Sequence, residues 1–119
     1  MGYTRVKVVV ASPWERIRRR EVELLADAGA MYTMLPESLL RALGITPSGW
    51  RRFKIASGEV KEYPTGEAYL EVEGIGVTSI VVFGAEGSTP LLGVTTLELL
   101  GLQVDPVTGR LKPMELLLL

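Results

Sequence analysis

The sequence contains no cysteine and no histidine. Without cysteine there is no disulfide, no thiolate zinc site and no cysteine nucleophile. Without histidine, the Ser-His-Asp and Cys-His catalytic arrangements are excluded, as are imidazole metal sites. Carboxylates, lysines and hydroxyls remain as candidate catalytic groups, and we expect neither a metal nor a cofactor.

A long apolar run and a strong charge of one sign are also missing. The first residues alternate polar and apolar side chains, unlike the unbroken apolar segment of a signal peptide or a membrane span. The 119 residues carry a formal net charge of -1, which gives no overall field that attracts nucleic acid. We therefore expect one globular domain over residues 1–119, in the cytoplasm, with neither nucleic acid nor a membrane as a partner.

Arginine is nevertheless abundant in one short segment, at Arg16, Arg18, Arg19 and Arg20. Successive side chains of a strand point to opposite faces, so a strand here would not present one basic stripe. A solvated face is the simpler interpretation of such a charge run. Nucleic-acid contact is the alternative, and a salt-dependent shift of a DNA or RNA probe would support it.

Hydrophobic periodicity predicts a protein made mainly of strands. Alternating or continuous apolar patterns indicate strands over residues 3–10, 15–25, 50–56, 59–63, 67–73, 77–83 and 102–104. Pro36 and Gly44 bracket a short helix over residues 36–43 that would bury Leu39, Leu40 and Leu43. A second helix over residues 95–100 is followed by Gly101. Many short strands with two short helices predict a closed or nearly closed β-barrel.

Aspartate occurs only twice, as Asp27 and Asp105. Asp27 follows an apolar-ended run and opens the sequence Asp27-Ala28-Gly29-Ala30, which predicts a carboxylate on a tight turn at the end of a buried strand. Such a carboxylate can activate water together with a second one. Asp105 precedes a proline and is predicted to be a turn residue. Asp-x-Gly alone also occurs in ordinary turns, so its context decides its meaning.

In that context the sequence resembles the retropepsin-like aspartic proteases, whose single-domain members are dimers. The matching pieces occur in the family's order: the strand into Asp27-Ala28-Gly29-Ala30, residues 32–36, a hairpin around Ser57-Gly58, and residues 90–93 followed by the helical residues 97–100 and Gly101. They cover nearly the whole chain. The resemblance implies a mostly β fold, the closed acid-protease barrel with one or two short helices and a flap hairpin.

The resemblance also implies an aspartic endopeptidase in which Asp27 is catalytic. In the family, two facing aspartates share a proton, one acting as base toward water while the other donates to the scissile carbonyl oxygen. Because Asp105 cannot complete the pair, the second carboxylate would come from Asp27 of another copy in a homodimer. The substrate would be an extended peptide or protein chain. The implied active-site loop is Ala28, Gly29 and Ala30, and the implied substrate-binding residues are Ala56, Ser57, Gly58, Leu91 and Leu92. For Leu92, core packing is an equally good interpretation.

Ala28 departs from the family pattern, which has threonine or serine there. That hydroxyl forms a hydrogen bond across the dimer axis, and alanine cannot form it. The alternative function is therefore a catalytically weak or inactive retropepsin-like domain that serves as a dimerisation or peptide-binding module. A small β-barrel adaptor unrelated to proteases is a third possibility.

The C-terminal segment, residues 114–119, ends in four leucines. Leucines left in water would be an aggregation hazard, so we expect the segment to pair with another strand. It would be buried either in the core of its own chain or as an edge strand across a subunit boundary.

Overall fold

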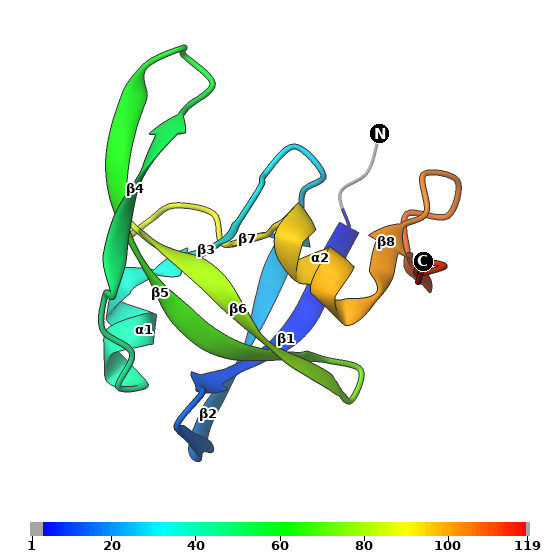
Figure 1. Ribbon diagram of the computed structural model, residues 1–119, viewed down its shortest axis with the longest axis horizontal. Helices are drawn as coiled ribbons and strands as arrows, with labels where there is room; N and C mark the ends of the chain where they lie inside the picture. Colours follow the sequence, from blue (N-terminus) through cyan, green and yellow to red (C-terminus); the bar gives the residue numbers. More distant parts are fainter. Residues whose placement is uncertain (1–3, 119) are drawn as a thin grey trace.

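The computed structural model describes residues 4–118 (Figure 1). The helices are α1 (Glu37–Ala42) and α2 (Val94–Leu100). The strands are β1 (Thr4–Ser12), β2 (Glu15–Ala26), β3 (Thr33–Pro36), β4 (Gly49–Lys54), β5 (Val60–Val72), β6 (Ile75–Gly84), β7 (Leu91–Leu92), β8 (Leu102–Val104) and β9 (Leu111–Pro113). The predicted mostly β fold with two short helices is confirmed.

Seven of the strands form one sheet that closes into a ring. Their order is β1-β2-β7-β3-β6-β5-β4, and β1 also pairs with β5. This last pairing is antiparallel and places Val10 opposite Leu70. β4 and the first half of β5 extend from the ring as a hairpin arm (Figure 1). The ring-like sheet is consistent with the retropepsin-like fold that the sequence implies.

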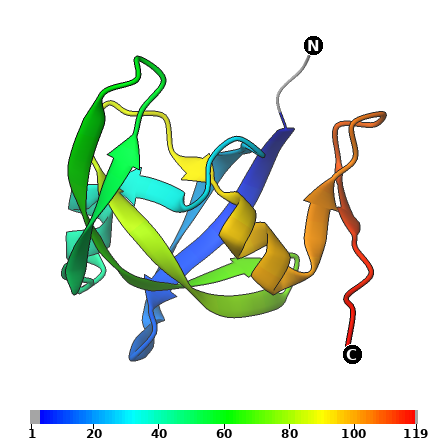
Figure 2. The same ribbon diagram turned by 45° about the horizontal axis from the view of Figure 1, so that its top comes forward.

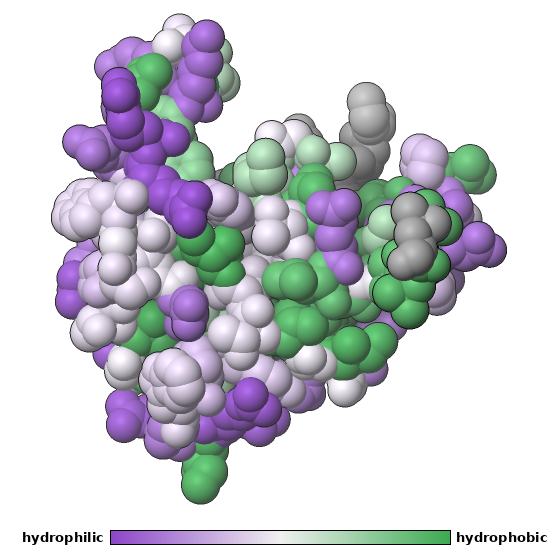
Figure 3. Space-filling model, viewed as in Figure 1, coloured by the Kyte–Doolittle hydropathy of each residue, from purple (hydrophilic) through white to green (hydrophobic). Residues whose placement is uncertain are grey.

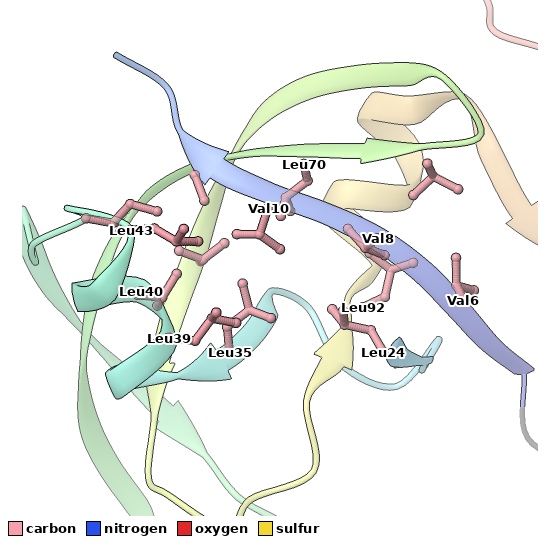
Figure 4. Packing of buried hydrophobic residues seen from close by; sticks show 14 of the residues in the cluster. Val6, Val8, Val10, Leu24, Leu35, Leu39, Leu40, Leu43, Leu70 and Leu92 are labelled. Atoms are coloured by element: carbon pink, nitrogen blue, oxygen red, sulfur yellow. The ribbon is translucent and has the colours of Figure 1, made fainter. Parts of the chain in front are cut away.

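The hydrophobic core fills the inside of the ring (Figure 4). β1 shows why: Val6, Val8 and Val10 are buried, whereas Arg5 and Lys7 on the opposite face of the strand are exposed. This is the two-residue period of a strand with one face against the core. α1 packs against one end of this core, and the predicted burial of its leucines is confirmed for Leu39, Leu40 and Leu43.

The sequence predicts two separate strands on either side of Pro64, but β5 is continuous through this proline. The segments 59–63 and 67–73 belong to one continuous strand, with Pro64 inside it. β4 pairs with β5 from Val60 to Thr65, and β6 pairs with it from Thr65 to Val72. Pro64 therefore has a partner strand on one side only, where a missing N–H is tolerated.

The turn between β5 and β6 and the start of α1 also differ slightly from the prediction. The turn between β5 and β6 consists of Glu73 and Gly74, both with positive φ, rather than residues 74–76. Such a pair of positive φ angles fits a two-residue hairpin turn. Pro36 precedes α1 as its N-cap residue instead of occupying its first turn.

The C-terminal tail is not buried in its own chain. β8 and β9 form a separate two-stranded sheet, and residues 114–118 follow it without forming a strand (Figure 2). Leu116, Leu117 and Leu118 are 68%, 84% and 99% exposed. The interpretation of these three leucines as core residues of the same chain is therefore wrong. Leu119 and Tyr3, the first residue of a predicted strand, lie outside the described residues.

Neither helix in residues 4–118 has the length and apolar character needed to cross a membrane.

Candidate active site

Asp27 lies where β2 leaves the sheet, as predicted. β2 runs parallel to the two-residue strand β7, with Ala26 opposite Leu92. The backbone N–H of Asp27 donates to the carbonyl oxygen of Leu92 at 3.0 Å. This hydrogen bond to β7 fixes the backbone of Asp27 immediately before the turn. The predicted position at a strand end is confirmed.

The turn after Asp27 holds one of its carboxylate oxygens. The Gly29 N–H donates to Asp27 Oδ1 at 2.8 Å, and the Ala30 N–H donates to the Asp27 carbonyl at 3.1 Å. Within residues 4–118, Oδ2 of Asp27 has no hydrogen-bond partner. Asp27 is half-buried, whereas Ala28 and Gly29 are exposed. One carboxylate oxygen is thus fixed, and the other remains available to water or a partner.

The loop that follows Asp27, predicted to be the active-site loop, is joined directly to the start of α2. Val94 N–H donates to the Ala30 carbonyl at 2.8 Å, and Thr95 N–H donates to the Met31 carbonyl at 3.0 Å. The first N–H groups of a helix lack partners within the helix, so the loop satisfies two of them. Residues 27–31 and α2 therefore support one another.

Gly93 makes a close backbone approach that explains the glycine in Leu91-Leu92-Gly93. A Cβ atom at this position would lie 2.4 Å from the carbonyl carbon of Tyr32. No larger residue fits without moving backbone atoms. The glycine thus allows α2 to begin directly beside the segment that follows Asp27.

A buried network of hydroxyl groups supports this junction. Thr96 Oγ1 lies 2.6 Å from Thr33 Oγ1 and 2.8 Å from Ser79 Oγ. Thr33 Oγ1 also accepts a hydrogen bond from the Gly93 N–H at 3.0 Å. Sequence reasoning missed these residues. The available signal was a hydroxyl at core-facing positions of otherwise apolar strands and a helix, which requires partners because buried polar groups are costly when unpaired.

The flap residues predicted from the sequence lie together at a hairpin tip. Ala56, Ser57 and Gly58 are exposed at the end of the β4–β5 arm. The turn is closed by hydrogen bonds from Ile55 N–H to Glu59 O and from Gly58 N–H to Ile55 O. Gly58 has φ of 88°, which favours glycine. In Figures 1 and 2 this arm and the loop after β2 rise on the same side of the ring.

An aromatic cluster links the arm to the segment after Asp27. The rings of Tyr32 and Phe53 meet edge to face, with centroids 5.8 Å apart, and Phe53 meets Tyr63 at 5.9 Å. The guanidinium of Arg51 lies 5.6 Å from the centre of the Tyr32 ring. The sequence offered no signal for this cluster, because its members are brought together only by the folded arm.

Leu91 and Leu92, both predicted to bind substrate, differ in burial. Leu91 is half-buried, but Leu92 is fully buried within the core. A side chain enclosed by the core cannot form a pocket wall, so the pocket interpretation of Leu92 is corrected to core packing.

Asp105 belongs to the turn between β8 and β9, as predicted. Its Oδ1 accepts a hydrogen bond from the Val107 N–H at 2.8 Å, and this bond lowers the pKa of Asp105. Its carbonyl accepts from Gly109 N–H at 2.8 Å. In the described part of the chain, no three acidic side chains gather into a group that could hold a metal.

Comparison with protein families places this geometry in context. The model of the gag-polyprotein putative aspartyl protease family matches residues 16–99, which is more than half of the chain. The chain belongs to this family. The range matched in this aspartyl protease family includes the Asp27 turn, the β4–β5 arm and Leu91-Leu92-Gly93. The interpretation as an adaptor unrelated to proteases is therefore wrong. A comparison with curated proteins gave no match.

Proposed function

We propose that this family member is an aspartic endopeptidase that hydrolyses peptide bonds as a homodimer, each subunit contributing Asp27. The observation that carries the proposal is the Asp27 carboxylate at the end of β2, with Oδ1 bound by the Gly29 N–H and Oδ2 free of partners in the described chain.

The chemistry follows from bringing two such carboxylates together. Two negative charges at short distance repel, so the pair keeps one shared proton. The ionised Asp27 accepts a proton from a water molecule as that water attacks the peptide carbonyl carbon. The protonated Asp27 of the second subunit donates to the carbonyl oxygen, which gives a tetrahedral diol. The first Asp27 then passes its new proton to the amide nitrogen, the C–N bond breaks, and one hydroxyl proton of the diol returns to the carboxylate pair as the acid product forms. The hydrogen bond from Gly29 holds each carboxylate in orientation during these transfers.

A second subunit is needed because the chain has only one other aspartate. Asp105 lies in the β8–β9 turn with its Oδ1 already bound. A two-fold axis beside Asp27 would pair it with its own copy. The exposed Ala28 and Met31 beside the site, and the exposed leucines of the tail, offer apolar surface that a second copy would cover.

The proposed substrate is an extended peptide lying between the Asp27 loop and the arm. Backbone groups of the arm would hydrogen-bond to the peptide, with Ala56, Ser57 and Gly58 closing over it. Gly29 and Ala30 would form the floor of the site, and the half-buried Leu91 would contact a substrate side chain.

Ala28 supports a second candidate function for the same fold. It is exposed and offers no hydroxyl to a second subunit. A domain that dimerises or binds peptides without cleaving them would tolerate this residue. In that case wild-type protein gives no turnover under any condition, and Ala28→Thr creates none.

The test of the protease proposal is Asp27→Asn, which keeps the shape of the side chain and removes its charge. The cleavage rate of an unfolded protein substrate, measured from acidic to neutral pH, is expected to fall by about 10²–10⁴-fold. The matched control is Asp105→Asn, which alters the other aspartate and should retain activity. Equal cleavage by wild-type protein and Asp27→Asn would contradict the proposal.

A further inference from the structure

The β1–β2 hairpin ends in an exposed tip that the Asp27 site does not use. The chain turns at Pro13 and Trp14, and β2 begins at Glu15. We refer to residues 14–20 as the basic hairpin tip. At its end, Trp14 is 86% exposed and Ile17 is 92% exposed. Two large apolar side chains so fully in water at one point are unusual for a surface that contacts only solvent.

Local hydrogen bonds hold this apex in shape. Oε1 of Glu15 accepts hydrogen bonds from the N–H groups of Ile17 at 2.9 Å and Arg18 at 3.1 Å. The Trp14 N–H donates to Ser12 Oγ at 3.2 Å. The apex is therefore a bonded turn whose apolar side chains project outward.

Positive side chains outnumber negative ones within the tip, although Glu67 lies in the same hollow as Trp14 and Glu71 accepts a hydrogen bond from the Tyr69 hydroxyl. The tip contains four arginines and one glutamate, a net charge of +3, whereas the whole chain has a net charge of -1. Among residues 4–118, only Arg18 of these arginines forms an ion pair, with Glu15 at 3.6 Å. The guanidinium of Arg16 lies 4.1 Å from the centre of the Tyr69 ring, and Arg19 Nε donates to the Arg16 carbonyl. These contacts orient the arginines without neutralising them.

We propose that the basic hairpin tip binds the surface of a bilayer that contains anionic lipids. Its apolar apex would enter the interface, where tryptophan is favoured, and its arginines would remain at the level of the headgroups. Each basic residue near an anionic membrane surface contributes about 1 kcal/mol. Figure 3 shows the same order at the lowest point of the molecule, with apolar atoms at the end and hydrophilic surface behind them.

The arrangement of the arginines favours a lipid surface over nucleic acid. Arg18 and Arg20 lie on one face of β2, and Arg19 lies on the other, because successive strand side chains alternate. A headgroup layer surrounds an inserted hairpin and meets both faces. Contacts to a phosphate backbone would not require an exposed isoleucine at the apex.

The binding surface and the proposed active site lie at opposite ends of the same strand. The regular part of β2 runs from Arg19, which pairs with Ala11, to Ala26, a span of roughly 23 Å at about 3.3 Å per residue. A molecule docked by its tip would keep the Asp27 loop away from the bilayer. This peripheral contact departs from the sequence-based expectation of no membrane partner, although it requires no membrane span. It is independent of whether the chain cleaves peptides.

The test is co-sedimentation of the full chain with phosphatidylcholine vesicles and with vesicles in which about one third of the lipid is phosphatidylglycerol. We expect binding to the anionic vesicles that weakens as salt is raised. Replacing Arg16, Arg19 and Arg20 by Gln should lower the affinity at least tenfold. Trp14→Ser and Ile17→Ser should each lower it severalfold. Thermal unfolding of every variant checks that the fold is intact.

Matched controls lie elsewhere on the surface. Val107→Ser changes another apolar side chain, 90% exposed in the β8–β9 turn, and Arg51→Gln with Arg52→Gln removes arginines from the arm. Neither should alter vesicle binding. Absence of binding to anionic vesicles, or equal binding by folded tip variants, would overturn the proposal. So would tighter binding to an RNA or DNA duplex that depends on the tip arginines but not on Trp14 or Ile17.

Discussion

At the scale of single residues, the site depends on small side chains as much as on the carboxylate. Gly29 lies so near Asp27 that a Cβ atom there would be 3.2 Å from Oδ1. Its N–H bonds to that same oxygen. The absence of a side chain thus leaves room for the bond that orients the carboxylate.

Ala28→Thr tests whether the missing hydroxyl limits dimerisation. By resemblance to the family, a threonine would hydrogen-bond across the two-fold axis in both copies. At about 1 kcal/mol for each net hydrogen bond, the dimer dissociation constant is expected to fall by about 5- to 30-fold. Sedimentation equilibrium measures this change. Ala85→Thr, at another exposed alanine, is the matched control, and equal dissociation constants for the two variants would refute the expectation.

Gly93→Ala tests the close approach between α2 and Tyr32. The added Cβ would meet backbone atoms at 2.4 Å, which cannot be relieved by a side-chain rotation. The free energy of unfolding is expected to fall by about 1–3 kcal/mol in urea denaturation. At Gly49, a Cβ atom would lie 3.7 Å from Thr65 Oγ1, an ordinary contact, so Gly49→Ala should change stability by about 0.5 kcal/mol or less. Equal effects of both substitutions would contradict this interpretation.

The sequence predicts the position of a site residue where a local pattern determines it. It does not predict residues that are brought together only by long-range contacts. The position of Asp27 at a strand end followed from an apolar run that stops at Asp-x-Gly. The hydroxyl contact between Thr33 and Thr96 joins residues 63 positions apart. No local pattern contains that pairing.

At the scale of elements, α1 is capped by a residue from a distant loop. Its N-cap residue, Pro36, makes no side-chain capping bond. Instead, the carboxylate of Glu86 accepts hydrogen bonds from Ser38 N–H at 3.0 Å and from Ser38 Oγ at 2.7 Å. Both bonds lower the pKa of Glu86, and the bond from the Ser38 backbone N–H has the larger effect. The loop after β6 is thereby attached to the start of the helix.

This cap predicts a pH-dependent effect of Glu86→Ala. A carboxylate with a lowered pKa in the folded state stabilises the fold above its unfolded pKa of about 4.3. That stabilisation is lost as the pH falls through the lower folded value. The substitution should reduce Tm by about 2–5 °C at pH 7 and by less at pH 3.5.

Thermal unfolding followed by circular dichroism at both pH values measures this difference. Glu98→Ala, at an exposed glutamate of α2 whose side chain makes no hydrogen bond in the described structure, is the control and should have a small effect at either pH. A Tm loss for Glu86→Ala that is the same at pH 7 and pH 3.5 would exclude the charged cap.

The two helices and most strands were predictable because their signals are local. Pro36 and Gly44 bracket α1, and Gly101 ends α2 with φ of 72°. The two-residue strand β7 was not predictable as a strand, because its identity comes from parallel pairing with β2 and not from its own length. The continuity of β5 through Pro64 likewise depends on which neighbour the proline faces.

At the scale of the whole molecule, the loop after β2, which begins at Asp27, and the β4–β5 arm lie on the same side of the ring (Figures 1 and 2). The resemblance of the sequence to retropepsin-like proteases predicted this fold, and family membership supports it. The sequence could not show whether the terminal leucines pack inside their own chain. Their exposure follows from the position of β8 and β9 outside the ring.

In the proposed function each chain supplies half of the catalytic site, and two Asp27 residues from two chains act together. The most direct measurement mixes wild-type protein with an excess of Asp27→Asn under conditions of subunit exchange. A heterodimer would contain one carboxylate and would be inactive. With nine parts of Asp27→Asn to one part of wild type, random pairing leaves about one tenth of the wild-type chains in intact dimers.

Cleavage per wild-type chain should therefore fall about tenfold in this mixture, whereas the same excess of Asp105→Asn should add activity in proportion to the protein added. Cleavage per wild-type chain that does not change as Asp27→Asn is added would contradict a site shared between two subunits.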